Sequence, residues 1–109
     1  MQKSKLKKNK IRVLLVDSHQ IVRKGIYQEI EKQLDMVVVG ETGNGYQALD
    51  LVKQLEVDVV ILDIQLSGLD GVKLARTLNE QATNTKRISS TPAIIVFSSY
   101  NDMQYVWSF

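Results

Sequence analysis

Continuous apolar runs and apolar residues at helical spacing alternate along this chain. The continuous runs occupy residues 11–16, 36–40, 57–62 and 93–97, and they are rich in valine and isoleucine. Short runs of this kind, bounded by turn residues, are typical of strands that are buried on both faces. We therefore predict four strands, the last of which directly follows Pro92, a position where proline is tolerated.

Between these strands, apolar residues recur every three or four positions. The spacing predicts an amphipathic helix over residues 19–34, a second through Ala48, Leu49, Val52 and Leu55, and a third through Val72, Leu74, Ala75 and Leu78. Asn44 is expected to cap the second helix, with Gln47 as its return partner. Residues 100–109 start a fourth helix, and the polar stretch 80–91 is an exposed insertion or an extended helix end.

Two carboxylates stand at the ends of predicted strands. The alternation of strands and helices favours a parallel sheet with helices on both faces. Asp17 follows the first strand and Asp63 follows the third. The carboxyl ends of parallel strands share one edge of the sheet, where open α/β folds bind their ligands. The sequence therefore predicts a site for a cation or a phosphoryl group at this edge.

Composition narrows the class of protein. The chain has 109 residues, of which 44% are hydrophobic and 24% charged, as expected for one domain with a modest core. It contains no cysteine, which excludes disulfides and thiolate metal sites. No apolar stretch resembles a membrane span or a signal peptide, so we expect a cytoplasmic protein with no membrane partner.

The charge distribution is uneven. Five lysines lie within residues 1–10, whereas the net charge of the whole chain is only +2, so the remainder is net negative. We predict a basic, flexible N-terminal tail over residues 1–10, with weak nucleic-acid attraction as the alternative. The remainder of the chain shows no pattern typical of a nucleic-acid-binding face.

Four motifs occur in a characteristic order: residues 12–17 (RVLLVD), 62–64 (LDI), 70–71 (DG) and 95–98 (IVFS). Together they resemble the receiver domain of response regulators over nearly the whole chain, and the sequences VRKGI and VVGE are similar to the NarL/LuxR-like subclass. The resemblance implies a flavodoxin-like (CheY-like) α/β fold, a doubly wound parallel sheet of order 2-1-3-4(-5). Residues 11–109 would then be a receiver domain truncated within helix four, with strand five and helix five absent.

In this family, the aspartate at the position of Asp63 is phosphorylated by a histidine kinase. The resemblance therefore implies a signalling module that is not an enzyme, with Asp63 as the phosphoacceptor and no catalytic residue. It also implies Mg²⁺ held by Asp17, Asp63 and the main-chain carbonyl of Gln65, because a carboxylate and a phosphoryl group repel each other without positive charge. Ser98 would hydrogen-bond the phosphoryl group as a switch.

The resemblance also implies partners. These are a sensor histidine kinase and a C-terminal helix-turn-helix domain, through which alone the protein would bind DNA and regulate transcription. Without a fifth strand, the fourth would be an exposed apolar edge. We therefore expect either a fragment of a longer protein or self-association, as a homodimer or by domain swapping. Tyr105 and Trp107 are expected to pack in the core or in an interface.

The chain departs from the family pattern at several positions. Ser18 stands where a second acid normally follows the first strand, so we expect a weakened Mg²⁺ site to which Ser18 contributes at most through a water. The alternative role of Ser18, and the one that we expect, is to cap the following helix. Leu66 and Ser67 replace the usual methionine and proline, and the family's lysine would lie near the end of the missing strand five. His19 is the only histidine, and we expect it to cap or flank the helix rather than bind metal.

Three alternative functions fit part of the sequence. The glycine pattern at residues 43–48, with Asp63 after it, matches a dinucleotide-binding fingerprint but leaves Asp17 unexplained. Gln65 excludes a haloacid-dehalogenase-like phosphatase, which needs an aspartate two positions after its nucleophile. Loss of the second acid at Ser18 favours a pseudo-receiver that works without phosphorylation, whereas the retained acids favour phosphorylation. We expect a receiver whose phosphorylation is impaired.

Overall fold

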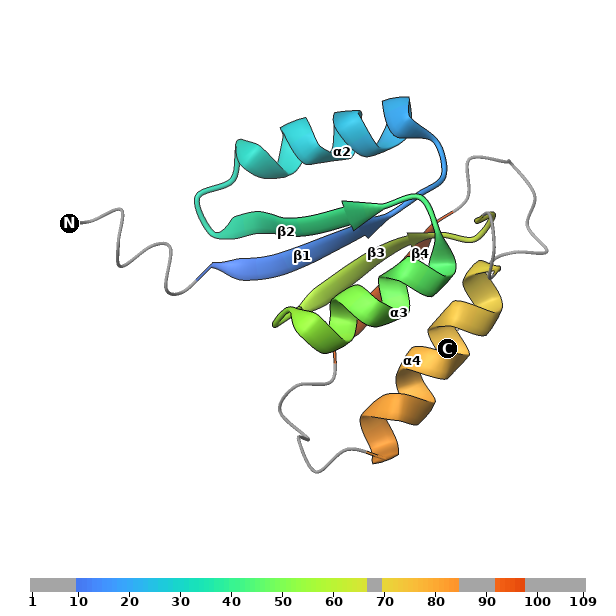
Figure 1. Cartoon of the computed structure of the whole chain (residues 1–109). Coiled ribbons are helices and arrows are strands. Elements are labelled where there is room, and N and C mark those ends of the chain that lie inside the picture. Colours follow the sequence, from blue (N-terminus) through green and yellow to red (C-terminus); the bar gives the residue numbers. More distant parts are fainter. Residues whose placement is uncertain (1–9, 67–69, 85–91, 98–109) are drawn as a thin grey trace.

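The computed structural model describes residues 10–66, 70–84 and 92–97, with the side chains of the last helix described as far as residue 80. Strands and helices alternate along these residues (Figure 1). In chain order they are β1 (Ile11–Val16), α2 (Gln20–Glu31), β2 (Met36–Thr42), α3 (Gly45–Gln54), β3 (Val59–Asp63), α4 (Gly71–Asn84) and β4 (Ala93–Phe97). The four strands and the first three helices predicted from the sequence are therefore confirmed.

The described strands form one parallel sheet in the order β2-β1-β3-β4, as predicted. Helix α2 packs on one face of this sheet, and α3 and α4 pack on the other (Figure 1). After β2, the chain crosses over β1 to place β3 on its other side. The carboxyl ends of β1 and β3 consequently lie side by side, at the point where the strand order reverses and such folds bind ligands.

Strand β1 shows why an unbroken apolar run is required at the centre of the sheet. Its side chains alternate between the two faces. Val13 and Leu15 pack toward Ile30 of α2, whereas Leu14 and Val16 pack toward α3 and α4. These four β1 side chains are at most 1% exposed, so each face of the strand contributes to one of the two cores.

Helix α2 is shorter than predicted. It covers Gln20–Glu31 rather than residues 19–34, and Leu34 lies outside it with 72% of its surface exposed. The chain must turn here because the carbonyl oxygen of Asp35 accepts the N–H of Ile11 at 2.7 Å, which fixes the approach to β2. Leu34 therefore continues the apolar period of the sequence without belonging to the buried face of the helix.

Strand β3 also begins two residues later than predicted, at Val59. Asp58 is held against β1, because its carboxylate accepts the N–H of Arg12 at 2.8 Å and its own N–H donates to the carbonyl of Arg12 at 2.8 Å. Val57 is buried before the strand begins. The apolar run of the sequence therefore includes a buried residue that precedes the ladder of β3.

Helix α3 begins with the predicted cap but without the predicted return partner. The side-chain oxygen of Asn44 accepts the N–H groups of Tyr46 at 2.8 Å and Gln47 at 3.1 Å, which confirms the cap. The N–H of Asn44 donates instead to the hydroxyl of Thr42 at 3.1 Å, and the amide oxygen of Gln47 accepts from that hydroxyl. The buried Thr42 thus accepts the N–H of Asn44, a role that was predicted for Gln47.

Several predictions concern residues outside the described ranges. These are the basic tail, the fourth helix with Tyr105 and Trp107, and the two positions Ser67 and Ser98. Helix α4 extends to Asn84, so the first part of the polar stretch 80–91 is a helix end. In the ranges that the structure describes, no helix is long and apolar enough to cross a membrane.

Candidate functional site

The fold brings Asp17 and Asp63 together at one edge of the sheet. Val16 and Leu62 are paired in the ladder between β1 and β3, and each acid directly follows one of these residues. Asp17 is 2% exposed and Asp63 is 1% exposed. Together with His19, they form a group whose potential ligand atoms lie within 4.8 Å of one another.

The hydrogen bonds of the two acids leave half of each carboxylate unsatisfied. Oδ1 of Asp17 accepts the N–H of His19 at 2.7 Å, and Oδ1 of Asp63 accepts the N–H of Gln65 at 3.2 Å. The two Oδ2 atoms are buried and have no hydrogen-bond partner among the described residues. Buried charges without partners are costly. A pair of orphaned carboxylate oxygens in one site therefore fits a cation.

The pKa of Asp63 is raised above that of an ordinary aspartate. Burial is the main cause, because it disfavours the charged carboxylate, and the nearby charge of Asp17 acts in the same direction. The N–H of Gln65 and the imidazole of His19 lower the pKa and offset only part of the increase. Without a cation, this site therefore holds a proton more readily than an exposed aspartate does.

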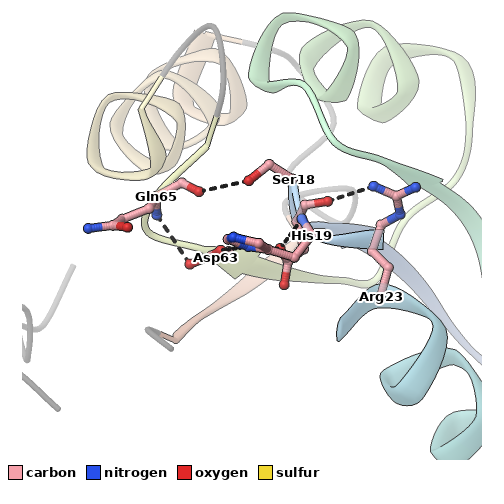
Figure 2. A network of polar contacts seen from close by, with 6 residues as sticks. Ser18, His19, Arg23, Asp63 and Gln65 are labelled. Atoms are coloured by element: carbon pink, nitrogen blue, oxygen red, sulfur yellow. Dashed lines mark hydrogen bonds and ion pairs between the residues drawn. The ribbon is translucent and has the colours of Figure 1, made fainter. Parts of the chain in front are cut away.

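Ser18 does not cap helix α2, in contrast to the prediction. The residue at the N-cap position is His19, and its side chain makes no capping hydrogen bond. The hydroxyl of Ser18 donates instead to the main-chain carbonyl oxygen of Gln65 at 3.3 Å (Figure 2). Ser18 therefore connects the loop after β1 to the loop after β3, close to the two acids.

His19 occupies the N-cap position of α2, as predicted, but its side chain contacts the two acids. Its Nδ1 is 3.2 Å from Oδ1 of Asp17 and 3.6 Å from Oδ2 of Asp63. The imidazole is 55% exposed, so it lies at the mouth of the site rather than inside it. Figure 2 shows the ring beside Asp63, directed toward the carboxylate rather than along the axis of α2. The single histidine therefore belongs to the site, and its backbone alone occupies the helix cap.

Arg23 is a site residue that the sequence analysis used only as a marker of the subclass. Its Nη1 donates to the main-chain oxygen of Asp17 at 2.7 Å, and its Nε donates to Glu41 at 3.0 Å (Figure 2). A Cβ atom on Gly43 would lie 3.0 Å from that Nη1. Arg23 therefore joins α2 to the loop after β1 and to the end of β2. The sequence signal for this role of Arg23 was its position one helical turn after His19.

Gly71 allows the start of α4 to lie against the end of β3. Its N–H donates to the carbonyl of Ile64 at 3.0 Å. A Cβ atom at this position would be 2.6 Å from the Cα of Ile64 and 2.7 Å from the carbonyl oxygen of Asp63. Only glycine fits this approach without moving the backbone that carries the acid.

The structure gives no support to the dinucleotide-binding alternative. A phosphate bound at a helix N-terminus needs free N–H groups there. At the start of α3, the N–H groups of Tyr46 and Gln47 are already bound by the side chain of Asn44. The glycine pattern is therefore a turn into a capped helix, and Asp63 faces Asp17 instead of a nucleotide loop.

Comparisons with known proteins agree with this geometry. Residues 13–108 match the response regulator receiver domain. The transcriptional regulatory protein LiaR of Bacillus subtilis is 34% identical over 97 residues, which cover 89% of this chain and 43% of LiaR. The nitrate/nitrite response regulator NarL of Escherichia coli is 34% identical over 89 residues, which cover 82% of this chain and 38% of NarL. The chain thus spans less than half the length of these curated relatives.

Solved structures show the same fold. The signal receiver domain of a NarL response regulator from Mycobacterium tuberculosis aligns with a TM-score of 0.74 and 26% identity, covering 86% of this chain and 70% of that one. RcsB from Salmonella enterica, solved on a promoter with the phosphomimetic BeF₃⁻, aligns with a TM-score of 0.75 and 26% identity, covering 86% of this chain and 45% of RcsB. The chain belongs to the response regulator receiver domain family, with relatives of the NarL/LuxR type.

Proposed function

We propose that Asp63 accepts a phosphoryl group from the phosphohistidine of a sensor kinase. The observation that carries this proposal is the buried Oδ2 of Asp63, which has no hydrogen-bond partner among the described residues and lies beside a second acid. An oxygen that accepts no hydrogen bond retains its lone pairs for attack on phosphorus. The attacking carboxylate and the phosphoryl oxygens are all negative, so the reaction needs a compensating cation.

Asp17, Asp63 and the main-chain carbonyl of Gln65 would hold Mg²⁺, which supplies this positive charge. The donor set fits the ion, because Mg²⁺ binds oxygen ligands and usually takes only one or two carboxylates from the protein. The orphaned Oδ2 atom of Asp17 supports this assignment. Ser18 contributes a hydroxyl hydrogen bond to Gln65 instead of a third carboxylate, so its part in metal binding is indirect and the site is weak.

The phosphorylated receiver would relay its state to a transcriptional output. LiaR, which is more than twice the length of this chain, is a transcriptional regulatory protein, and RcsB was solved on promoter DNA. We propose Ser98 as the residue that hydrogen-bonds the phosphoryl group and a C-terminal domain as the part that binds DNA. Pairing of two receivers would accompany activation, and Asp63 would act as a stoichiometric acceptor rather than as part of an enzyme.

The experiment that tests the proposal is intact-mass measurement after incubation with Mg²⁺ and acetyl phosphate. We expect a phosphoryl adduct on the wild-type chain and none on Asp63→Ala. Ser18→Asp restores the usual acid and should increase the adduct yield. An adduct of equal yield in Asp63→Ala would refute the role of Asp63.

A second candidate function is a pseudo-receiver, which binds its partner without phosphorylation. The observation that favours it is Ser18, because a hydroxyl that donates to Gln65 replaces the family's second acid. Absence of an adduct in the wild-type chain together with a clear adduct in Ser18→Asp would favour this function. The wild-type site would then retain its geometry while lacking sufficient cation binding.

A further inference from the structure

We propose that Nδ1 of His19 is a third ligand at the acidic site, and that Asp17, His19 and Asp63 together prefer Zn²⁺ or Co²⁺ to Mg²⁺. The inference deepens the proposed function, because it uses the same two acids. It concerns which cation this particular chain selects. The resemblance implies only an oxygen-ligand Mg²⁺ site, so a nitrogen ligand goes beyond what the resemblance implies.

Two of the three distances between the candidate ligand atoms fit one shared ion. Ligand atoms that share a metal at bond lengths of about 2.0–2.2 Å lie roughly 3.0–3.6 Å from one another. Nδ1 of His19 lies 3.2 Å from Oδ1 of Asp17 and 3.6 Å from Oδ2 of Asp63. The complete set of three lies within 4.8 Å. Small side-chain rotations are therefore sufficient to close the set around a cation.

The buried carboxylate atoms of the site point to a cation, which would replace the contacts that the imidazole of His19 makes with Asp17 and Asp63. Oδ2 of Asp17 and Oδ2 of Asp63 are buried and have no hydrogen-bond partner within the described ranges. Arg23 donates to the main-chain oxygen of Asp17 and to Glu41 instead of to the two carboxylates. The imidazole of His19 can carry at most one positive charge against two carboxylates, so a bound divalent ion would neutralise more of the negative charge of the site.

His19 is held in position by its own backbone. The N–H of His19 donates to Oδ1 of Asp17 at 2.7 Å, so the residue that carries the imidazole also orients one of the carboxylates. Such hydrogen bonds fix the direction in which a ligand presents its lone pairs. The ring is 55% exposed, so part of it faces solvent.

The ligand types determine the preference. Imidazole suits Zn²⁺, Co²⁺ and similar ions, whereas Mg²⁺ prefers oxygen ligands and binds imidazole poorly. Two carboxylates and one imidazole also match zinc sites in which three protein ligands leave a fourth position open. Ser18 removes the third carboxylate that would favour Mg²⁺. The open position would be available to water or to a phosphoryl oxygen.

The test is titration of the metal-free chain with ZnCl₂, CoCl₂ and MgCl₂, followed by calorimetry and, for Co²⁺, by its visible absorption. We expect wild-type Zn²⁺ affinity to exceed Mg²⁺ affinity by at least about tenfold. His19→Ala should lose at least about tenfold in Zn²⁺ and Co²⁺ affinity, keep Mg²⁺ affinity within about threefold, and change the Co²⁺ spectrum. Gln20→Ala, at the adjacent exposed position, is the matched control and should match the wild type.

The assignment of ligands is unambiguous because the chain contains one histidine and no cysteine. Retained Mg²⁺ binding in His19→Ala would also show that this variant is folded. Equal Zn²⁺ affinity in wild type and His19→Ala, or an equal loss for all three ions, would overturn the proposal. The acetyl phosphate reaction with Mg²⁺ is measured separately, so failure of the phosphoacceptor role and failure of the His19 role give different results.

Discussion

The hydroxyl of Ser18 donates a hydrogen bond to the main-chain carbonyl oxygen of Gln65 at 3.3 Å, and so connects the loops after β1 and β3. This carbonyl is the neutral oxygen that we assign to Mg²⁺. A carbonyl oxygen has two lone pairs, so it can accept from Ser18 and still bind an ion. The serine would therefore position the proposed metal ligand Gln65, whereas the family's second acid would bind the metal itself.

Replacing Ser18 with Asp should increase Mg²⁺ affinity by at least about tenfold, which corresponds to about 1.4 kcal/mol. The physical reason is a third carboxylate at a site that already holds two buried acids. The same change should lower the metal-free stability, because like charges repel. Calorimetric titration with MgCl₂ and urea unfolding with and without Mg²⁺ measure the two effects.

Ser18→Ala is the matched control for this prediction. It removes the hydrogen bond to Gln65 without adding charge, so Mg²⁺ affinity should stay the same or fall. An equal rise in affinity for the Ala and Asp variants would contradict the argument, because it would show that the hydroxyl itself hinders the metal.

The fold was predictable because each strand signal is local and strong. The run at residues 11–16 has apolar residues at consecutive positions, as a strand buried on both faces requires, and the acids that end two such runs define the edge of the sheet. The ends of elements were harder to predict. Leu34 and Val57 extend apolar patterns into turns, because the hydrogen bonds of Asp35 and Asp58 that end the elements connect residues distant in sequence.

The site was only partly predictable for the same reason. Asp17 and Asp63 were identified because parallel strands present their ends at one edge. The roles of Ser18 and His19 were assigned from helix-capping preferences, which consider only the neighbouring residues. In the structure, the side chain of Ser18 contacts Gln65 just after β3, and that of His19 contacts Asp63 at the end of β3. Such contacts, with a sequence separation of more than forty residues, have no local signal.

The metal-free protein should be less stable than Asp63→Asn at neutral pH. The pKa of Asp63 is higher in the folded state than in the unfolded chain, so the unfolded chain releases this proton first as the pH rises. Stability is therefore lost from about pH 4 upward, and the full loss persists above the folded-state pKa. Asn at this position removes the charge, and its amide can donate to the orphaned oxygen of Asp17.

We expect Asp63→Asn to gain about 1–2 kcal/mol at pH 7 in EDTA, and little below pH 4. Urea unfolding between pH 3.5 and 8 measures this difference. Saturating Mg²⁺ should stabilise the wild type by mass action and reduce the difference. A gain that does not change with pH would contradict this account, because a neutral packing effect has no reason to follow the titration of one carboxyl group.

Arg23→Ala should destabilise the chain by about 1–2 kcal/mol, because the hydrogen bonds that join α2 to Asp17 and to Glu41 in β2 are lost. It should also weaken Mg²⁺ binding, since the main chain of Asp17 loses its restraint. Urea unfolding and MgCl₂ titration measure both. Arg23→Lys should recover only part of the loss, because one ammonium group does not reproduce the guanidinium geometry.

Glu41→Gln is the control that separates the two contacts of Arg23. It keeps an acceptor for Nε but removes the charge, and Glu41 is 41% exposed, so the cost should be within about 0.5 kcal/mol. Its Mg²⁺ affinity should match that of the wild type. If Glu41→Gln weakens Mg²⁺ binding as much as Arg23→Ala does, the contact with the main chain of Asp17 is not the one that matters.

Gly71→Ala should destabilise the protein by about 2–3 kcal/mol, because the new Cβ would meet backbone atoms of Ile64 and Asp63 at 2.6–2.8 Å. These atoms belong to the chain that positions the phosphoacceptor, so adduct formation with acetyl phosphate should fall as well. Gly25→Ala offers a matched control, because nothing lies within 4 Å of its added Cβ and the residue lies inside α2. This second change should stabilise the chain by about 0.5–1 kcal/mol through helix propensity. Equal effects of the two substitutions in urea unfolding would show that the close approach at Gly71 relaxes without cost.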